Sequence, residues 1–129
     1  MDKTVLVIDN DEALVAVESF YFSEQGYTVY TAFDGDVGVR LALQHKPAAI
    51  VCDVVMEKMH GFEVLRKLRE NPDMKHTVVV MTSAKAYKPD IDRARDLGAT
   101  DYVVKPFRTD ELLALIERHL ASFGKQEDH

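Results

Sequence analysis

Four apolar runs in this sequence are each followed directly by residues whose side chains can take part in chemistry. These residues are Asp9-Asn10-Asp11, Asp53, Thr82-Ser83 and Lys105-Pro106. Two carboxylates about 4 Å apart repel each other by roughly 4 kcal/mol at an effective dielectric constant of about 20. A hard divalent cation such as Mg²⁺ removes that repulsion, and a lysine and a hydroxyl beside it bind phosphoryl oxygens. If folding brings these groups together, they predict a Mg²⁺ site in which one carboxylate accepts a phosphoryl group.

The elements that must position these side chains are five short runs rich in β-branched residues. The runs span residues 5–8, 27–32, 48–52, 78–81 and 102–104. Four of the five are almost continuously apolar, as is typical of strands buried on both faces of a parallel sheet. Helix-period segments alternate with them, which predicts βαβ units. The fold class is therefore α/β: a doubly wound five-stranded parallel sheet in the flavodoxin-like order 2-1-3-4-5, with five helices.

Apolar residues between the strands recur at the three- and four-residue spacing of helices. The sets are Ala13, Val17, Phe20 and Tyr21; Phe62, Leu65 and Leu68; and Leu112, Leu115, Ile116, His119 and Leu120. Gly26 and Gly98 are predicted to end helices, and Asn71-Pro72 to break the third one. Thr109, which precedes two acids, is predicted to cap the last helix.

The predicted sheet brings the reactive residues together. Ligands of open α/β sheets bind outside the carboxyl ends of the strands, at the point where the strand order reverses. The first and third strands are neighbours at that point, so Asp9 and Asp53 are expected to share one crevice. Thr82 and Lys105 are expected to flank it from the fourth and fifth strands.

Length and charge restrict the organisation of the chain and its partners. The 129 residues fit one domain over 1–123, followed by a polar tail over 124–129. The net charge of −6 argues against direct binding of nucleic acid, which needs a basic face. No apolar run approaches the roughly 20 residues of a membrane span, and the single cysteine, Cys52, excludes an internal disulfide. We expect a cytoplasmic protein without membrane contact, in which Cys52 is a small core residue.

Four stretches in the right order resemble the receiver domains of two-component response regulators, the CheY-like superfamily. The stretches are VLVIDNDE at 5–12, DVVMEKMHG at 53–61, MTSA at 81–84, and DYVVKPF at 101–107 with Gly98-Ala99 just before it. The resemblance covers essentially the whole chain. It implies that Asp53 is the phosphoacceptor and that the donor is a histidine kinase or a histidine phosphotransfer protein. It also implies a signalling domain that promotes only its own phosphorylation and slow dephosphorylation, and is otherwise not an enzyme.

The resemblance assigns further roles at the site. The Mg²⁺ cofactor would be bound by Asp9, Asn10, Asp53 and the backbone carbonyl of Val55, and the phosphoryl group by Thr82, Ser83 and Lys105. The Lys105-Pro106 peptide bond is expected to be cis, which would aim the lysine at the site.

The same resemblance predicts how the domain switches. Thr82 is expected to move toward the phosphoryl group and Tyr102 to turn inward in response. That change would alter the surface formed by the fourth helix, the fifth strand and the fifth helix, to which an unidentified protein target would bind. Whether these helices also form a homodimer stays open.

Several positions depart from the family pattern or vary within it. Asn10 stands where the family has a second acid that binds Mg²⁺, so we expect weaker Mg²⁺ binding. Glu57 stands where the family has proline, and Glu57 or Asp11 is a hypothetical replacement for the missing charge. Val55 and Ala84 are expected to border the path of the hydrolytic water without offering it a hydrogen bond, which predicts slow dephosphorylation.

Two other functions and one structural alternative fit parts of the sequence. A pseudo-receiver, a binding module that kept the fold, fits the loss of an acid at Asn10. A haloacid-dehalogenase-type phosphatase fits the spacing of Asp9, as nucleophile, and Asp11, as general acid. Against it, no strand-ending acidic pair follows Lys105, and the length leaves no room for a cap domain. Finally, Asp9 and Asp53 are also suited to cap the helices that follow them.

Overall fold

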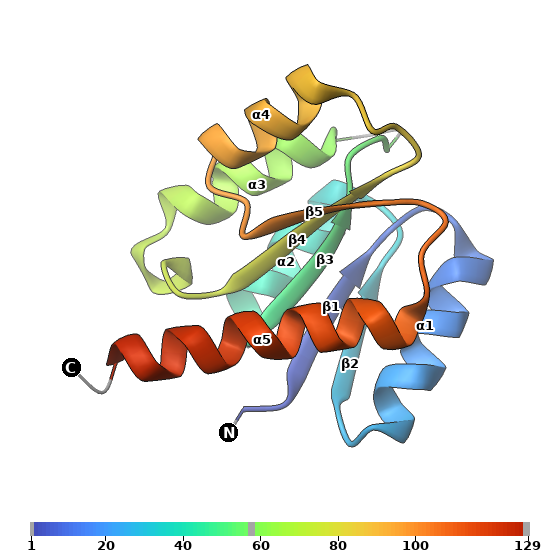
Figure 1. Ribbon diagram of the computed structural model, residues 1–129, viewed down its shortest axis with the longest axis vertical. Helices are drawn as coiled ribbons and strands as arrows, with labels where there is room; N and C mark the ends of the chain where they lie inside the picture. Colours follow the sequence, from blue (N-terminus) through green and yellow to red (C-terminus); the bar gives the residue numbers. More distant parts are fainter. Residues whose placement is uncertain (1, 57–58, 128–129) are drawn as a thin grey trace.

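A computed structural model of the protein describes residues 2–56 and 59–127, and it shows one parallel sheet between two layers of helices (Figure 1). In chain order the elements are β1 (Thr4–Ile8), α1 (Glu12–Glu24), β2 (Thr28–Ala32), α2 (Gly35–His45), β3 (Ala49–Asp53), α3 (Gly61–Glu70), a 3₁₀ turn (Pro72–Met74), β4 (Val78–Ser83), α4 (Lys88–Asp96), β5 (Asp101–Val104) and α5 (Thr109–Glu127). All strand pairs are parallel, and the order is β2-β1-β3-β4-β5. The predicted fold class and strand order are confirmed.

Two apolar clusters lie on the two faces of the sheet. One, with Val7, Val51 and Val80 from the strands, packs against α1 and α5. The other, with Leu6, Ile50 and further residues, packs against α2, α3 and α4. Successive side chains of a strand alternate between the two faces, so the odd-numbered residues of β1, β3 and β5 and the even-numbered residues of β4 face α1 and α5. Cys52 lies in the second cluster and is fully buried, as predicted.

Most helix ends agree with those predicted from the sequence. Gly26 and Gly98 have φ values of 89° and 101°, in the left-handed region that favours glycine. Helix α3 ends at Glu70, just before Asn71-Pro72. At α5 the prediction was wrong by one residue, because Thr109 is already helical and the carbonyl of Arg108 accepts the hydrogen bond from the Leu112 N–H. The same helix continues through 124–127, the first part of the segment predicted as a tail.

The caps of the helices near the predicted site are not the residues considered for that role. The Asp11 carboxylate accepts a hydrogen bond from the Leu14 N–H and caps α1. His60 caps α3, since its Nδ1 accepts a hydrogen bond from the Phe62 N–H. Asp9 and Asp53 are therefore left for another role.

Helix α1 turns a different face to the sheet than its apolar spacing suggests. Val17 and Phe20, two members of the periodic apolar set, are 56% and 69% exposed. The buried residues of α1 are Val15, Glu18 and Phe22. The helix carries apolar side chains on both sides, so spacing alone did not identify the buried one.

Within the described part of the chain, no helix is long and apolar enough to cross a membrane. The departure from the family pattern at Glu57 lies outside the described residues.

Candidate functional site

The alternation of side chains along the strands gathers the predicted site residues on one face of the sheet. Asp9 comes two residues after Val7, and Asp53 two after Val51, so both continue rows that face α1 and α5. Thr82 likewise continues the row of Val80. The register pairs Asp53 with Thr82 on the neighbouring strand.

Lys105 joins the two acids. Its Nζ donates to Asp9 Oδ2 at 2.8 Å and to Asp53 Oδ2 at 3.2 Å. The side chain of Lys105 is 20% exposed, while those of Asp9 and Asp53 are 4% and 10% exposed. One ammonium group thus binds two nearly buried carboxylates. This arrangement confirms the prediction that the residues at the ends of the first, third and fifth strands lie together.

The second oxygen of each carboxylate is bound by the backbone. The Asp11 N–H donates to Asp9 Oδ1 at 2.9 Å, and the Val55 N–H donates to Asp53 Oδ1 at 3.3 Å. The start of α3 packs directly against the same loop, since a Cβ on Gly61 would collide with the backbone carbonyl of Asp53. The orientation of both acids is therefore fixed by backbone contacts as well as by Lys105.

Burial and charge act together on the ionisation of the site. Burial, and then the charge of Asp9, raise the pKa of Asp53 above its ordinary value, although Lys105 opposes them. For Lys105, burial alone would lower the pKa, but the hydrogen bonds and charges of Asp9 and Asp53 outweigh it and raise the pKa. The ammonium is thus stabilised between two acids that need a positive neighbour.

The oxygen groups around Asp53 have the chemistry that Mg²⁺ prefers. Asp9 and Asp53 supply carboxylates, and the amide of Asn10 and the carbonyl of Val55 are neutral oxygen donors on the exposed rim. Among the described residues, no three side chains of His, Cys, Asp or Glu are grouped closely enough to hold a metal. A cation at this place would depend on two acids plus neutral oxygens, and these residues fit Mg²⁺ in kind.

The residues predicted for phosphoryl binding and switching separate into two groups. Thr82 is 1% exposed and lies on the face of Asp53. The side chains of Ser83 and Tyr102 belong to the opposite face, although the Ser83 backbone carbonyl accepts a hydrogen bond from the Lys105 N–H at 2.7 Å. The Ser83 hydroxyl instead accepts a hydrogen bond from the Lys85 N–H at 3.1 Å. The Tyr102 hydroxyl donates to the Lys85 carbonyl at 3.0 Å.

The Lys105-Pro106 peptide bond is cis, as expected.

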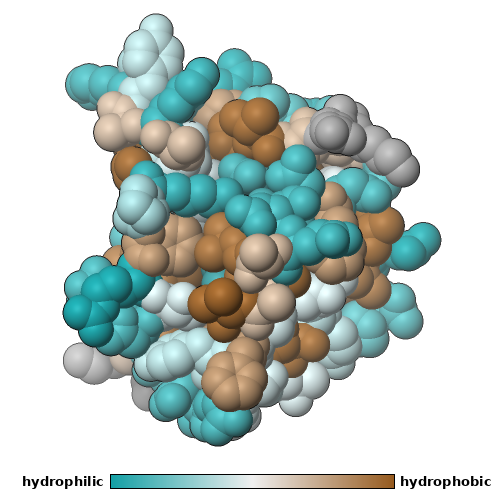
Figure 2. All heavy atoms as spheres, turned by 90° about the vertical axis from the view of Figure 1, so that its right-hand side faces the viewer, coloured by the Kyte–Doolittle hydropathy of each residue, from teal (hydrophilic) through white to brown (hydrophobic). Residues whose placement is uncertain are grey.

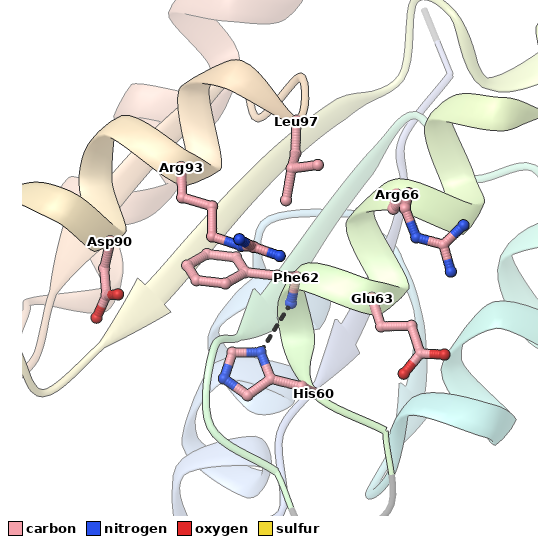
Figure 3. A pocket seen from close by; sticks show the side chains of 7 residues that line it. All are labelled: His60, Phe62, Glu63, Arg66, Asp90, Arg93 and Leu97. Atoms are coloured by element: carbon pink, nitrogen blue, oxygen red, sulfur yellow. Dashed lines mark hydrogen bonds between the residues drawn. The ribbon is translucent and has the colours of Figure 1, made fainter.

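His60, which follows Asp53 closely in the sequence, lies at another place. It lines a groove of about 560 Å³ between α3 and α4, where the guanidinium of Arg93 lies 5.6 Å from the centroid of the Phe62 ring (Figure 3).

One buried acid was missed in the sequence. Glu18, on the buried side of α1, is 1% exposed, and the charges that act on it include those of Asp9, Lys105 and Asp53. Its spacing from Val15 and Phe22 places it on one helix face, but apolar residues lie on both sides of α1, so the sequence did not show that this face is the buried one.

The fold and the site define a CheY-like α/β domain with an acid–lysine cluster at the carboxyl edge of its sheet. The model of the response regulator receiver domain family matches residues 5–117. The chain therefore belongs to the response regulator receiver domain family, which is a signalling domain rather than a conventional enzyme. This membership removes the phosphatase hypothesis in which Asp9 is the nucleophile.

Several solved structures are similar to this chain. The chemotaxis protein CheY4 of Vibrio cholerae has 29% identity and a TM-score of 0.86, covering 92% of this chain and 98% of that one. The BeF3-activated DrrB receiver domain has 26% identity and a TM-score of 0.82, covering 94% and 99%. A CheY-like receiver domain protein of Methanospirillum hungatei has a TM-score of 0.91 over 98% and 99%, and at 22% identity it supports the fold alone.

Proposed function

We propose that this domain accepts a phosphoryl group on Asp53 from a histidine kinase or a histidine phosphotransfer protein, and then changes the surface formed by α4, β5 and α5. The observation that carries the proposal is the position of Lys105 Nζ, within hydrogen-bond distance of Asp9 and Asp53 at the carboxyl edge of the sheet. Membership in the receiver family supports the same assignment.

The chemistry follows from the groups at the site. A carboxylate oxygen of Asp53 attacks the phosphorus of a phosphohistidine, a P–O bond forms, and the P–N bond breaks with its electron pair left on the imidazole. Lys105 offsets the charge of the phosphoryl oxygens, and Thr82 offers them a hydroxyl. Mg²⁺, held by Asp9, Asn10, Asp53 and the Val55 carbonyl, would supply further neutralisation of charge.

An apolar surface beside the site supports a protein as the phosphodonor. An opening of about 350 Å³ next to Lys105 is lined by Leu14, Pro106, Phe107 and three other residues. The exposed Val17 and Phe20 extend apolar surface from this opening along α1. Figure 2 shows the side of the molecule that carries α1, with hydrophobic side chains gathered near its middle. An exposed apolar patch beside a reactive group fits contact with a partner protein.

The proposed switch passes through the loop between β4 and α4. Thr82 precedes this loop, and Lys85 within it is bound by both the Ser83 and the Tyr102 hydroxyls. Movement of Thr82 toward a phosphoryl group would shift the loop and release the Tyr102 hydroxyl from the Lys85 carbonyl. The Tyr102 ring lines the groove between α4 and β5, so its movement would reshape that surface.

Binding of beryllofluoride in the presence of Mg²⁺ tests this function against the pseudo-receiver alternative. We expect wild type to bind it and the amide resonances of Thr82, Lys85 and Tyr102 to shift in NMR spectra. Asp53→Asn, which lacks the carboxylate, is expected to show neither effect. Failure of wild type to bind at near-millimolar beryllofluoride would favour a binding module that kept only the fold.

A further inference from the structure

Helix α1, which covers the face of the sheet that carries Asp9 and Asp53, has a carboxylic acid on its buried side. Glu18 is 1% exposed, and among the described residues its Oε1 has no hydrogen-bond partner. Its neighbours on the buried side of α1 are Val15 and Phe22, which belong to the apolar cluster between α1, α5 and the sheet. An apolar side chain would fill this position at lower cost, because a buried polar group without a partner is destabilising.

The direction of the Glu18 side chain relates it to the cluster of Asp9, Asp53 and Lys105. Helical side chains tilt toward the N-terminus of their helix, and α1 begins directly after Asp9, at the carboxyl edge of the sheet. Asp9 and Asp53 lie on the sheet face that α1 covers. The Glu18 side chain is therefore directed from α1 toward the sheet face that carries Asp9 and Asp53, on the side of these acids that faces the protein interior.

The charges around Glu18 all belong to this region. The groups that act on it are Asp9, Lys105, Asp11 and Asp53. Burial, and then the charge of Asp9, raise the pKa of Glu18 to about 8, which explains how an acid without a partner is tolerated beside two carboxylates. A positive charge placed between Asp9 and Asp53 acts on Glu18 in the opposite direction and favours its carboxylate form.

The site also has one negative charge fewer than the family pattern provides, and a buried acid can offset that difference. Its rim carries the neutral Asn10, so within the described residues a divalent cation would meet two carboxylates and no third. The Asp11 carboxylate already caps α1. Among the buried acids of the described residues, Glu18 is the one with a buried carboxyl oxygen, Oε1, that has no hydrogen-bond partner.

We propose that Glu18 is a positioning acid of the phosphoacceptor site, which raises the affinity of the site for Mg²⁺ through its charge and so compensates for Asn10. It does not bind the ion directly, since it is not grouped with Asp9 and Asp53 closely enough to be a ligand. This inference rests on the proposed function, because it assumes that Mg²⁺ binds at Asp9 and Asp53.

Calorimetric titration of the full chain with MgCl₂ near pH 8 tests the proposal. We expect Glu18→Gln, which keeps the shape and removes the charge, to weaken Mg²⁺ binding by about tenfold, because the attraction between a buried negative charge and the cation is lost. Glu24→Gln, with the same change of charge at an exposed position of the same helix, is the matched control and is expected to bind like wild type.

Two further variants separate charge from shape. In the background of Asn10→Asp, which restores an acid at the rim, Glu18→Gln is expected to weaken Mg²⁺ binding by clearly less than tenfold. Glu18→Asp, which keeps the charge, is expected to bind Mg²⁺ more tightly than Glu18→Gln, and it serves as the deciding variant if the glutamine variant does not fold. Equal affinity of wild type and Glu18→Gln, or equal losses in the aspartate and glutamine variants, would overturn the inference. Absence of Mg²⁺ binding in wild type would instead count against the proposed function.

Discussion

At the scale of single residues, Lys105 determines whether two nearly buried acids can lie together. Asp9 and Asp53 are 4% and 10% exposed in their side chains, and both bind the same nitrogen. Without that ammonium, each carboxylate would lose its positive neighbour and keep its negative one. The stability of the domain and the chemistry of the site therefore depend on the same cation.

Lys105→Met should show this dependence. We expect the free energy of unfolding without Mg²⁺ to fall by about 1.5–3 kcal/mol, the range for hydrogen bonds to charged groups. Saturating Mg²⁺ should restore more stability to the variant than it adds to wild type, because the ion replaces the missing charge. Urea unfolding with and without MgCl₂ measures both quantities, and equal effects of Mg²⁺ on the two proteins would contradict the account.

The Glu18 carboxyl makes the free energy of unfolding depend on pH. Its pKa is about 8 in the folded state against 4.5 ordinarily, so between these values the folded chain holds a proton that the unfolded chain has released. Stability from this group is present below about pH 4.5 and is lost as the pH rises through 8. We expect wild type to lose at least about 2 kcal/mol relative to Glu18→Gln between pH 5.5 and 8.5. Denaturant titrations of both proteins across this pH range measure the difference. Parallel dependences of unfolding free energy on pH in wild type and Glu18→Gln would contradict the expectation.

At the scale of elements, α1 serves two purposes with its two sides. Its buried side contributes Val15, Glu18 and Phe22, while its outer side exposes Val17 and Phe20. Because the exposed side chains make little contact within the domain, their contribution is expected in binding rather than in folding.

Phe20→Ser separates these two contributions. We expect the free energy of unfolding to change by less than about 0.5 kcal/mol, as for other exposed positions. Labelling by acetyl phosphate should equal that of wild type, whereas transfer from a phosphorylated histidine donor protein should slow. Equal transfer from the protein donor would show that this side of α1 is not the donor's contact surface.

The start of α3 holds the loop that carries Asp53. A Cβ on Gly61 would collide with the Asp53 carbonyl and lie 2.7 Å from Val54 Cα, both of them backbone atoms. Gly61→Ala should therefore destabilise the domain by about 1–3 kcal/mol and slow phosphorylation of Asp53. Thermal unfolding and acetyl phosphate labelling measure the two effects, and an unchanged labelling rate would argue that the contact does not orient Asp53.

At the scale of the whole molecule, most of the fold could be predicted from the sequence because its strands are buried on both faces. Continuous apolar runs such as 78–81 identify such strands, and the order of the strands then brings Asp9, Asp53 and Lys105 to one edge. The distances around Lys105 agree with that prediction.

The remaining features depend on packing that no local pattern records. Helix α1 has apolar residues on both sides, so the spacing of Val17 and Phe20 indicated the exposed side instead of the buried one. Glu18 was missed for the same reason, since an acid is expected on the outer side of a helix. The role of Ser83 in phosphoryl binding stays a prediction, since alternation along β4 turns its side chain to the other face, where its hydroxyl accepts a hydrogen bond from the Lys85 N–H.

The central claim is that the acids ending β1 and β3, with the ammonium after β5, form one site for phosphoryl transfer to Asp53. Intact mass spectrometry after incubation with acetyl phosphate and Mg²⁺ tests it most directly. We predict that wild type gains the mass of one phosphoryl group, that chelation of Mg²⁺ prevents the gain, and that Asp53→Asn shows none. Labelling of Asp53→Asn equal to that of wild type, or no labelling of wild type at any Mg²⁺ concentration, would contradict the claim.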